Sequence, residues 1–377
     1  MKLRMRALLL GLVLAGASFP AEAITPAASP AMTENEIAHA NEQTRSFLKT
    51  KMAEMHIPGL QVAVVVQGRV VMSEAYGIAN IEQQIAVDRQ ILFPINSATK
   101  SFTGVAIMQL VEAGLVDLEA PISRYLEGLP ESWRGVRIRQ LLAHSSGIPN
   151  IVDENGLIGG GGETEAWVKV QTLPMESIPG THFSYNQTNY VLLGQIIQKL
   201  SGHNFEQFFA DRQFKPASMT HARFGDGYDI VPGRVGVYIR RAGKGAAKPD
   251  GEKLYHWIDD IPEITRPGAG LYTTADQLAQ WIIALENGRL LAKKSSLARL
   301  WQPDVLNDGK SNIWAMGWPL LEGTSHRAVG GIGGGRSAFF VYPDDDVAVI
   351  VLTNLVGTNP QNMIDVIAGQ YMASTHR

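Results

Sequence analysis

A serine and a lysine stand three positions apart at the start of an apolar segment. They are Ser97 and Lys100 in "FPINSATKSF" (93–102), and the almost wholly apolar run 102–113 follows them, with Gly114 next. Residues three apart lie on the same face of a helix. A lysine with a lowered pKa could take the hydroxyl proton while the helix N-terminus stabilises developing negative charge. The spacing therefore predicts a nucleophile with its base.

The position of this lysine runs against ordinary helix chemistry. Asn96 is predicted as the N-cap of a helix over 97–113, and a cation in the first turn is unfavourable by about 0.3–1 kcal/mol. A compensating role for Lys100 beside Ser97 would explain it. A second S-x-x-K, Ser46 to Lys49, lies in a charged amphipathic stretch, so we interpret it as surface helix.

A third candidate is Tyr185 in "GTHFSYNQTNYVLLG" (180–194), which stands before a predicted helix and among several amide side chains. His144 in "LLAHSSG" lacks a G-x-S-x-G elbow, so we interpret it as a structural loop histidine. The nine histidines form neither H-x-H nor H-E-x-x-H, and no metal site is predicted.

The N-terminus predicts an export signal over 1–23, with basic residues, an apolar run and "AEA" at 21–23, so we expect a periplasmic or secreted protein. After this signal the sequence has no run of 18 apolar residues, so we predict no integral membrane segment after signal removal. The chain has no cysteine, which excludes disulfides and thiol catalysis. Its formal charge of -3 gives no case for a nucleic-acid partner, and the oligomeric state stays open.

Strand patterns stand near both ends of the chain. The segments 60–76 and 337–354 each predict an antiparallel hairpin, and helical patterns lie between and after them, over 97–113, 137–143, 189–200, 204–214, 273–287, 293–301 and 359–372. We therefore predict an α+β fold in which both chain ends build one antiparallel sheet flanked by helices. The sheet lobe would span about 33–96 and 270–377, with a mostly helical lobe over about 97–269.

Five segments in order resemble the serine β-lactamase and DD-peptidase superfamily, in particular its class C β-lactamase-like branch, which includes carboxylesterases and D-amino-acid peptidases. They are "FPINSATKSFTGVAIMQLVEAGLVDLEAPISRYL", "IRQLLAHSSGIPN", "FSYNQTNYVLLG", "GAGLYTTADQLAQW" and "VYPDDDVAVIVLTN". The resemblance implies a β-lactamase or penicillin-binding-protein-like fold, with Ser97 as nucleophile, Lys100 as its partner and Tyr185 as the first residue of a Y-x-N element. It implies an acyl substrate and no cofactor.

The chain departs from this pattern at two elements. Gln187 replaces the asparagine of Y-x-N, and we expect it to orient the substrate. The third element, K-T-G or H-x-G, would fall in "SHRAVGGIGGGRSAFFVYP" (325–343), where two registers are possible and neither supplies a cation. The backbone N–H completing an oxyanion hole with that of Ser97 would come from Gly331 or Gly334. His326 and Arg336 are close in the sequence and could reach the site.

Three functional hypotheses follow. The first is a serine hydrolase that forms an acyl-enzyme at Ser97 with ester or amide substrates, because losing the third-element cation weakens the case for carboxylate-anchored ones. The second is a true β-lactamase or D-Ala-D-Ala carboxypeptidase in which His326 or Arg336 anchors the carboxylate. The third is a noncatalytic ligand-binding or scaffold protein, which a solvent-facing Lys100 would favour.

Overall fold

The computed structural model describes residues 32–240, 253–321 and 323–372, so the export signal predicted over 1–23 lies outside the described residues. The main feature is a six-stranded antiparallel sheet in the order β11-β12-β13-β1-β2-β3. Its strands are β1 (Gly59–Val66), β2 (Arg69–Asn80), β3 (Ile85–Ala86), β11 (Val329–Gly333), β12 (Ser337–Tyr342) and β13 (Val347–Thr353).

The sheet is built from both ends of the chain. β1 pairs with β13 from Leu60↔Thr353 to Val66↔Val347. The turn of the first hairpin lies at Gln67 and Gly68, which both have positive φ, as a tight turn between right-twisted strands requires. Mixed helices and an antiparallel sheet of this kind confirm the predicted α+β class, whereas the lobe boundaries near 96 and 270 stay a prediction.

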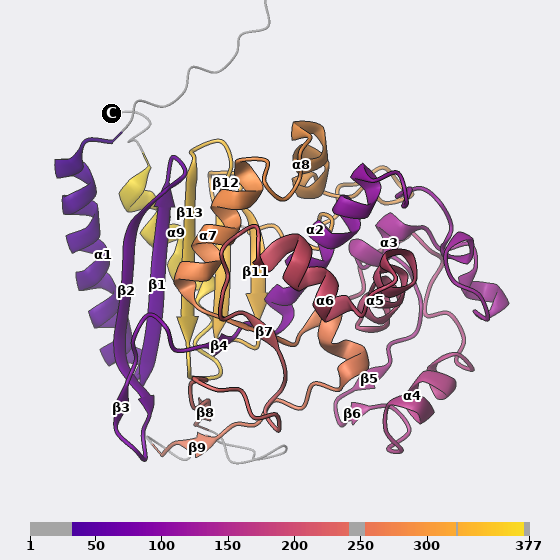
Figure 1. The fold of residues 1–377 in the computed structure, drawn as a ribbon, viewed down its shortest axis with the longest axis horizontal. Coiled ribbons are helices and arrows are strands. Elements are labelled where there is room, and N and C mark those ends of the chain that lie inside the picture. The colour runs from indigo at the N-terminus through magenta and orange to yellow at the C-terminus, as the bar shows by residue number, and fades with distance from the viewer. Residues whose placement is uncertain (1–31, 241–252, 322, 373–377) are drawn as a thin grey trace, which may run out of the picture. The chain divides into compact units, whose positions relative to one another are not determined.

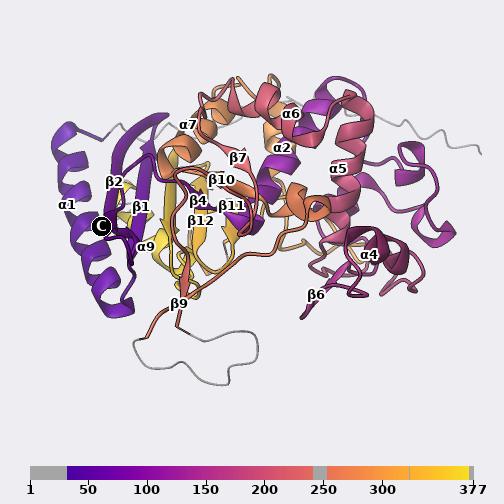
Figure 2. The same cartoon turned by 60° about the horizontal axis from the view of Figure 1, so that its bottom comes forward.

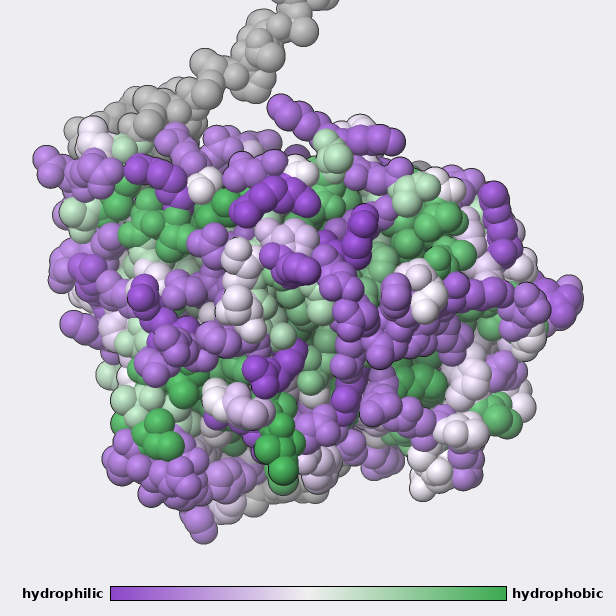
Figure 3. Space-filling view, in the orientation of Figure 1, coloured by the Kyte–Doolittle hydropathy of each residue, from purple (hydrophilic) through white to green (hydrophobic). Residues whose placement is uncertain are grey.

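Helices cover both faces of the sheet, which explains why all of β1 is buried. Alternate residues of β1 point to opposite faces. Leu60, Val62 and Val64 pack in a cluster with residues of α1 (Glu34–Met55) and α9 (Gln361–Tyr371). Ala63 and Val65 pack in the cluster that includes α7 (Ala275–Glu286) and α2 (Thr99–Glu112). The face turned to the viewer in Figure 1 is largely hydrophilic at its surface (Figure 3).

The other helices are α3 (Ile138–Leu142), α4 (Glu163–Val170), α5 (Thr188–Ser201), α6 (Phe205–Phe209) and α8 (Lys294–Trp301). The short strands are β4 (Phe93–Pro94), β5 (Val152–Asp153), β6 (Gly156–Leu157), β7 (Arg223–Phe224), β8 (Tyr238–Ile239), β9 (Tyr255–His256) and β10 (Leu271–Thr273). Within the described ranges, no helix has both the length and the apolar character needed to cross a membrane.

The start of α2 lies beside the sheet edge that β11 forms, between the sheet and helices α3, α5 and α6 (Figures 1 and 2). The carbonyl of Gly330 in β11 accepts a hydrogen bond of 3.1 Å from Ser101 Oγ in α2. A Cβ added to Gly333 would lie 2.8 Å from the nitrogen of Ser97 and 1.9 Å from the carbonyl oxygen of Ile95. Glycine at 333 therefore lets the strand approach the turn that carries Ser97.

Candidate active site

Ser97 lies in a 3₁₀ turn, Asn96–Ala98, directly before α2, and lines a cleft of about 410 Å³. Asn96 has a φ of 45°, a left-handed conformation that asparagine tolerates better than most residues. The prediction of Asn96 as N-cap is wrong: α2 begins at Thr99, and the Asn96 Oδ1 instead accepts a 2.7 Å hydrogen bond from Arg336. The buried guanidinium draws this side chain away from the helix end.

Lys100 is completely buried in the first turn of α2. Its Nζ donates hydrogen bonds of 2.9 Å to Gln187 Oε1 and 2.9 Å to the carbonyl oxygen of Gly268, and it lies 3.4 Å from Ser97 Oγ. Residues far apart in sequence thus converge on one amine.

Burial lowers the pKa of Lys100 well below its usual value, because desolvation disfavours the charged amine. In its neutral form this amine has two N–H donors and one lone pair. With Gln187 and Gly268 accepting from the two donors, the lone pair of that form would face the Ser97 hydroxyl. A neutral amine also has little unfavourable interaction with the helix dipole, so burial accounts for a lysine at this helix end.

Tyr185 lies just before α5, and its hydroxyl donates a 2.8 Å hydrogen bond to Ser97 Oγ. Its ring centroid is 4.7 Å from Lys100 Nζ. Desolvation raises the pKa of Tyr185 to about 12, although 39% of the residue is exposed and solvent weakens this effect. The pKa values of the two groups beside Ser97 are therefore shifted in opposite directions, that of the lysine down and that of the tyrosine up.

His144 packs against the ring of Tyr185 inside the fold. The buried imidazole has its ring centroid 4.5 Å from that of Tyr185 and 5.0 Å from that of Trp314. Its Nδ1 accepts a 3.0 Å hydrogen bond from the backbone N–H of Asn186. Burial, with a contribution from Lys100, lowers the pKa of His144 well below its usual value. These contacts fit the structural role expected from the sequence.

Gly268 supplies an acceptor that the sequence reasoning missed. It ends the 3₁₀ segment Glu263–Gly268, and a Cβ there would lie 3.3 Å from Lys100 Nζ and 3.1 Å from Gln187 Oε1. A side chain would crowd the lysine, so glycine suits this position. The only signal in the sequence was that "GAGLYTTADQLAQW" begins at this residue.

Alternate backbone groups of β11 point to its outer edge, away from β12, toward the segment at Pro319 and the start of α2. The N–H of Gly330 donates to Pro319 outside the six-stranded sheet, at 3.0 Å. Because the direction alternates along a strand, the N–H of Ile332 points to the same edge and that of Gly331 toward β12. Gly334 follows the strand in the turn, with a φ of 57°. Ile332 is the middle residue of the second register considered from the sequence, Gly331-Ile332-Gly333, which gives the oxyanion N–H to Gly334; Gly334 lines the cleft together with Ser97.

Both candidate carboxylate anchors, His326 and Arg336, have acidic partners. Arg336 is only 1% exposed and forms an ion pair with Asp259 beside its bond to Asn96. His326 Nδ1 lies 2.9 Å from Asp345, in the turn between β12 and β13. The last residue of β11, Gly333, lies beside Ser97, whereas the first residue of the strand lies near this turn. The structure thus brings Lys100, Tyr185 and Gln187 to Ser97. Arg336 is buried against Asn96, and His326 lies near the opposite end of β11.

Comparisons with known proteins match most of the chain. Protein flp of Staphylococcus aureus (strain MW2) is 25% identical over 84% of this chain, which spans 63% of that relative's length. The putative penicillin-binding protein PbpX of Bacillus subtilis (strain 168) is 29% identical over 75% of this chain and 66% of its own. The structure of the octameric penicillin-binding protein homologue from Pyrococcus abyssi has a TM-score of 0.69 and 25% identity, covering 87% of this chain and 76% of its own.

A family model described as Beta-lactamase matches residues 44–370. This range includes Ser97, Lys100 and Tyr185, and it extends through β11 and β13. The match, the similar fold and the penicillin-binding relatives agree with the resemblance seen in the sequence, and they support a serine hydrolase type of function in general terms. The chain belongs to the Beta-lactamase family.

Proposed function

We propose that this protein is a serine hydrolase that forms an acyl-enzyme at Ser97 with ester or amide substrates. The observation that carries the proposal is the environment of Lys100, a fully buried amine whose Nζ donates to the neutral acceptors of Gln187 and Gly268. In its neutral form, the lone pair of this amine would face Ser97 Oγ, at 3.4 Å. A neutral base beside a hydroxyl is what nucleophilic catalysis by serine requires.

In the proposed reaction, Ser97 Oγ attacks the acyl carbonyl while its proton moves to Lys100 Nζ. The opposite pKa shifts of Lys100 and Tyr185 indicate which group accepts and which donates. Tyr185 donates its proton to the leaving group as that bond breaks, and the proton on Lys100 then restores the tyrosine. Water attacks the acyl-enzyme by the reverse sequence and releases the acid.

The oxyanion of each tetrahedral intermediate needs two donors. We assign them to the backbone N–H groups of Ser97 and Gly334. The support for Gly334 is its position, since it lines the cleft together with Ser97, whereas the alternation of β11 turns the N–H of Gly331 toward β12.

The other two hypotheses receive less support. A carboxylate-anchoring enzyme needs a cation in the cleft, but Arg336 is buried against Asp259, and His326 is paired with Asp345. A noncatalytic protein would have no need of a buried lysine directed at Ser97, and Lys100 does not face solvent.

The test is the intact mass of the protein after exposure to a serine-reactive fluorophosphonate. We expect one adduct, which Ser97→Ala abolishes. Ser46→Ala is the matched control, because Ser46 belongs to the second S-x-x-K and lies exposed on α1, so this variant should keep the adduct. Hydrolysis of p-nitrophenyl butyrate should follow the same pattern. A folded wild-type protein that takes no label and hydrolyses no ester would overturn the proposal.

A further inference from the structure

The Arg336 guanidinium lies close to the nucleophile, but Asp259 stands between it and the cleft. Arg336 is 1% exposed and is not among the residues that line the cleft, whereas Asp259 lines it. One carboxylate oxygen of Asp259 accepts from Arg336, and the other accepts a 2.9 Å hydrogen bond from the indole N–H of Trp257. The Asp259 carboxylate therefore compensates the positive charge of Arg336, and no uncompensated cation of the described residues faces the cleft.

The charged residues that line the cleft are all acidic. Asp259 and the exposed Asp260 lie in its wall, and no lysine, arginine or histidine is among the lining residues of the described structure. The rest of the lining includes the apolar side chains of Val152, Leu157, Ile258 and Ile261. Because the Asp259–Arg336 pair is neutral as a whole, a carboxylate entering this space would meet the negative charge of Asp260 and, among the described lining residues, no free cation, which is unfavourable at short range.

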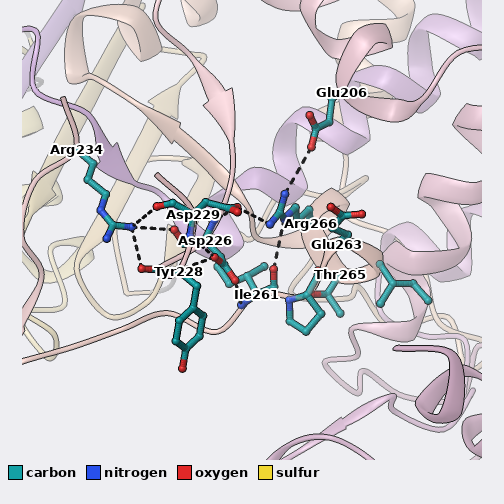
Figure 4. Close-up of polar contacts among 12 residues, drawn as sticks. Glu206, Asp226, Tyr228, Asp229, Arg234, Ile261, Glu263, Thr265 and Arg266 are labelled. Carbon is teal, nitrogen blue, oxygen red and sulfur yellow. Dashed lines mark hydrogen bonds and ion pairs between the residues drawn. The ribbon is translucent and has the colours of Figure 1, made fainter. Parts of the chain in front are cut away.

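The segment that follows these acids is held by side chains that do not line the cleft, those of Asp226, Asp229 and Arg266 (Figure 4). The Asp226 carboxylate accepts a 3.3 Å hydrogen bond from the backbone N–H of Ile261. Arg266 donates to Asp229 at 2.5 Å and to the carbonyl oxygen of Ile261 at 3.4 Å. These bonds fix the backbone just after Asp260, so the acidic wall is preorganised rather than free to swing away.

A second contact holds Asp259 itself. Its carbonyl oxygen accepts a 2.7 Å hydrogen bond from the N–H of Gly227, on the loop that Arg234 ties together by donating to three backbone carbonyl oxygens (Figure 4). A Cβ on Gly227 would lie 2.6 Å from that same carbonyl oxygen, so glycine permits the close approach. The backbone of Asp259 is thus held in place next to Arg336.

We propose that Asp259 is a specificity-determining residue which masks Arg336 and makes the cleft select neutral or cationic acyl substrates over those that carry a carboxylate. This inference rests on the proposed function, and it names the charge class of the substrates of that same site. Removing the Asp259 charge would leave the guanidinium uncompensated next to the cleft and convert a carboxylate-excluding site into a carboxylate-accepting one.

The experiment compares kcat/KM for matched esters. On the acyl side the pair is p-nitrophenyl butyrate and p-nitrophenyl hemisuccinate. On the leaving-group side the set is the butyrate esters of methyl 4-hydroxybenzoate, 4-hydroxybenzoate and 4-(trimethylammonio)phenol. Each value is divided by the hydroxide rate of the same ester, which removes differences in intrinsic reactivity. The wild-type enzyme should prefer the neutral and cationic members by about tenfold or more on at least one side.

Three variants identify the residue responsible. Asp259→Asn should raise the anionic-to-neutral ratio by about tenfold on the side where the wild type discriminates. Asp260→Asn removes one negative charge from the same wall without freeing Arg336, so the ratio should rise by clearly less. Asp259→Asn combined with Arg336→Gln should lose the gain, because the uncovered cation is gone. Circular dichroism and thermal melting show whether each variant is folded.

Failure of the inference can be told apart from failure of the function. If the wild type hydrolyses no ester, the proposed function falls. If it hydrolyses neutral and anionic esters equally well on both sides, only the role of Asp259 is overturned, and this holds even if Asp259→Asn does not fold. A gain in Asp259→Asn that persists in the double variant would also overturn it, since Arg336 would then not be its source.

Discussion

At the scale of single residues, burial rather than a neighbouring charge prepares Lys100 for its role. Desolvation is the cause of its lowered pKa, and its contacts are the neutral acceptors of Gln187 and Gly268. A neutral amine inside the fold and a charged one in the unfolded chain bind different numbers of protons. The site therefore couples the free energy of unfolding to pH.

The sign of this coupling can be stated. The unfolded chain keeps the Lys100 proton up to a pH of about 10.4, while the folded chain releases it at lower pH. Between the two pKa values, folded stability increases with pH, by up to about 1.4 kcal/mol per unit, and it is lost as the pH falls. Lys100→Met lacks this contribution.

Urea unfolding between pH 7 and 9 tests the prediction. The free energy of unfolding of the wild type relative to Lys100→Met should increase with pH. Lys199→Met, which replaces a half-exposed lysine on α5, should run parallel to the wild type. Parallel curves for the wild type and Lys100→Met would show that Lys100 is charged in the folded protein.

The side chains of the candidate site could be predicted from the sequence, but its backbone groups could not. Ser97, Lys100 and Tyr185 carry chemistry in their own side chains, so spacing and neighbouring helix patterns draw attention to them. The Gly268 carbonyl and the N–H proposed for the oxyanion are groups that every residue has, so the sequence missed the first and left the second open between Gly331 and Gly334. Asp259 is noticed only when the fold brings it to Arg336, 77 residues away.

At the scale of elements, the site depends on how closely the segment before β10 approaches α2 and α5. Gly268 lies at this junction, and a Cβ on it would come within 3.1 Å of Gln187 Oε1 and Tyr190 Cβ. Its φ lies outside the left-handed region, so alanine fits the backbone there. A substitution would consequently disturb the lysine contacts without straining the chain.

We expect Gly268→Ala to lower kcat/KM for p-nitrophenyl butyrate by about 10², the lower end of what general acid–base catalysis contributes, because Lys100 loses its alignment with Ser97. Gly369→Ala is the matched control: it lies in α9 with no atom within 4 Å of the added Cβ, so activity should be unchanged and stability slightly higher. Wild-type activity in Gly268→Ala would contradict the role given to this carbonyl.

Helices with a clear hydrophobic periodicity were predicted well, whereas the glycine-rich strand β11 was not predicted. Helix patterns over 189–200 and 273–287 match α5 (Thr188–Ser201) and α7 (Ala275–Glu286) within two residues. β11 has the sequence VGGIG, and glycine has low strand propensity, so no pattern marked it. Its pairing with β12 creates the strand. Because no pattern marked this strand, the sequence did not decide the register of the third element.

At the scale of the whole molecule, the central strands of the sheet hold the fold together. β1 and β13 are buried along their full lengths and covered on both faces, whereas β3 (Ile85–Ala86) is an exposed edge strand. Amides in such central strands exchange only when the molecule unfolds globally, and edge amides exchange through local opening.

Hydrogen–deuterium exchange with mass spectrometry checks this. Peptides from 59–66 and 347–353 should exchange slowest, with an opening free energy equal to that of global unfolding from urea titration. The peptide that contains 85–86 should exchange orders of magnitude faster. Equal rates for these peptides would contradict the assignment of the stable core.

The pairing of β1 with β13 has a consequence for how the chain folds. Leu60 meets Thr353, so the ladder at the centre of the sheet joins residues that are 293 positions apart in the sequence. Closing so long a loop is entropically costly, and topologies rich in such distant contacts fold slowly. During synthesis this ladder can form only after residues 347–353 have left the ribosome. Until then β1 has an open edge, and the nascent protein is a natural client for chaperones.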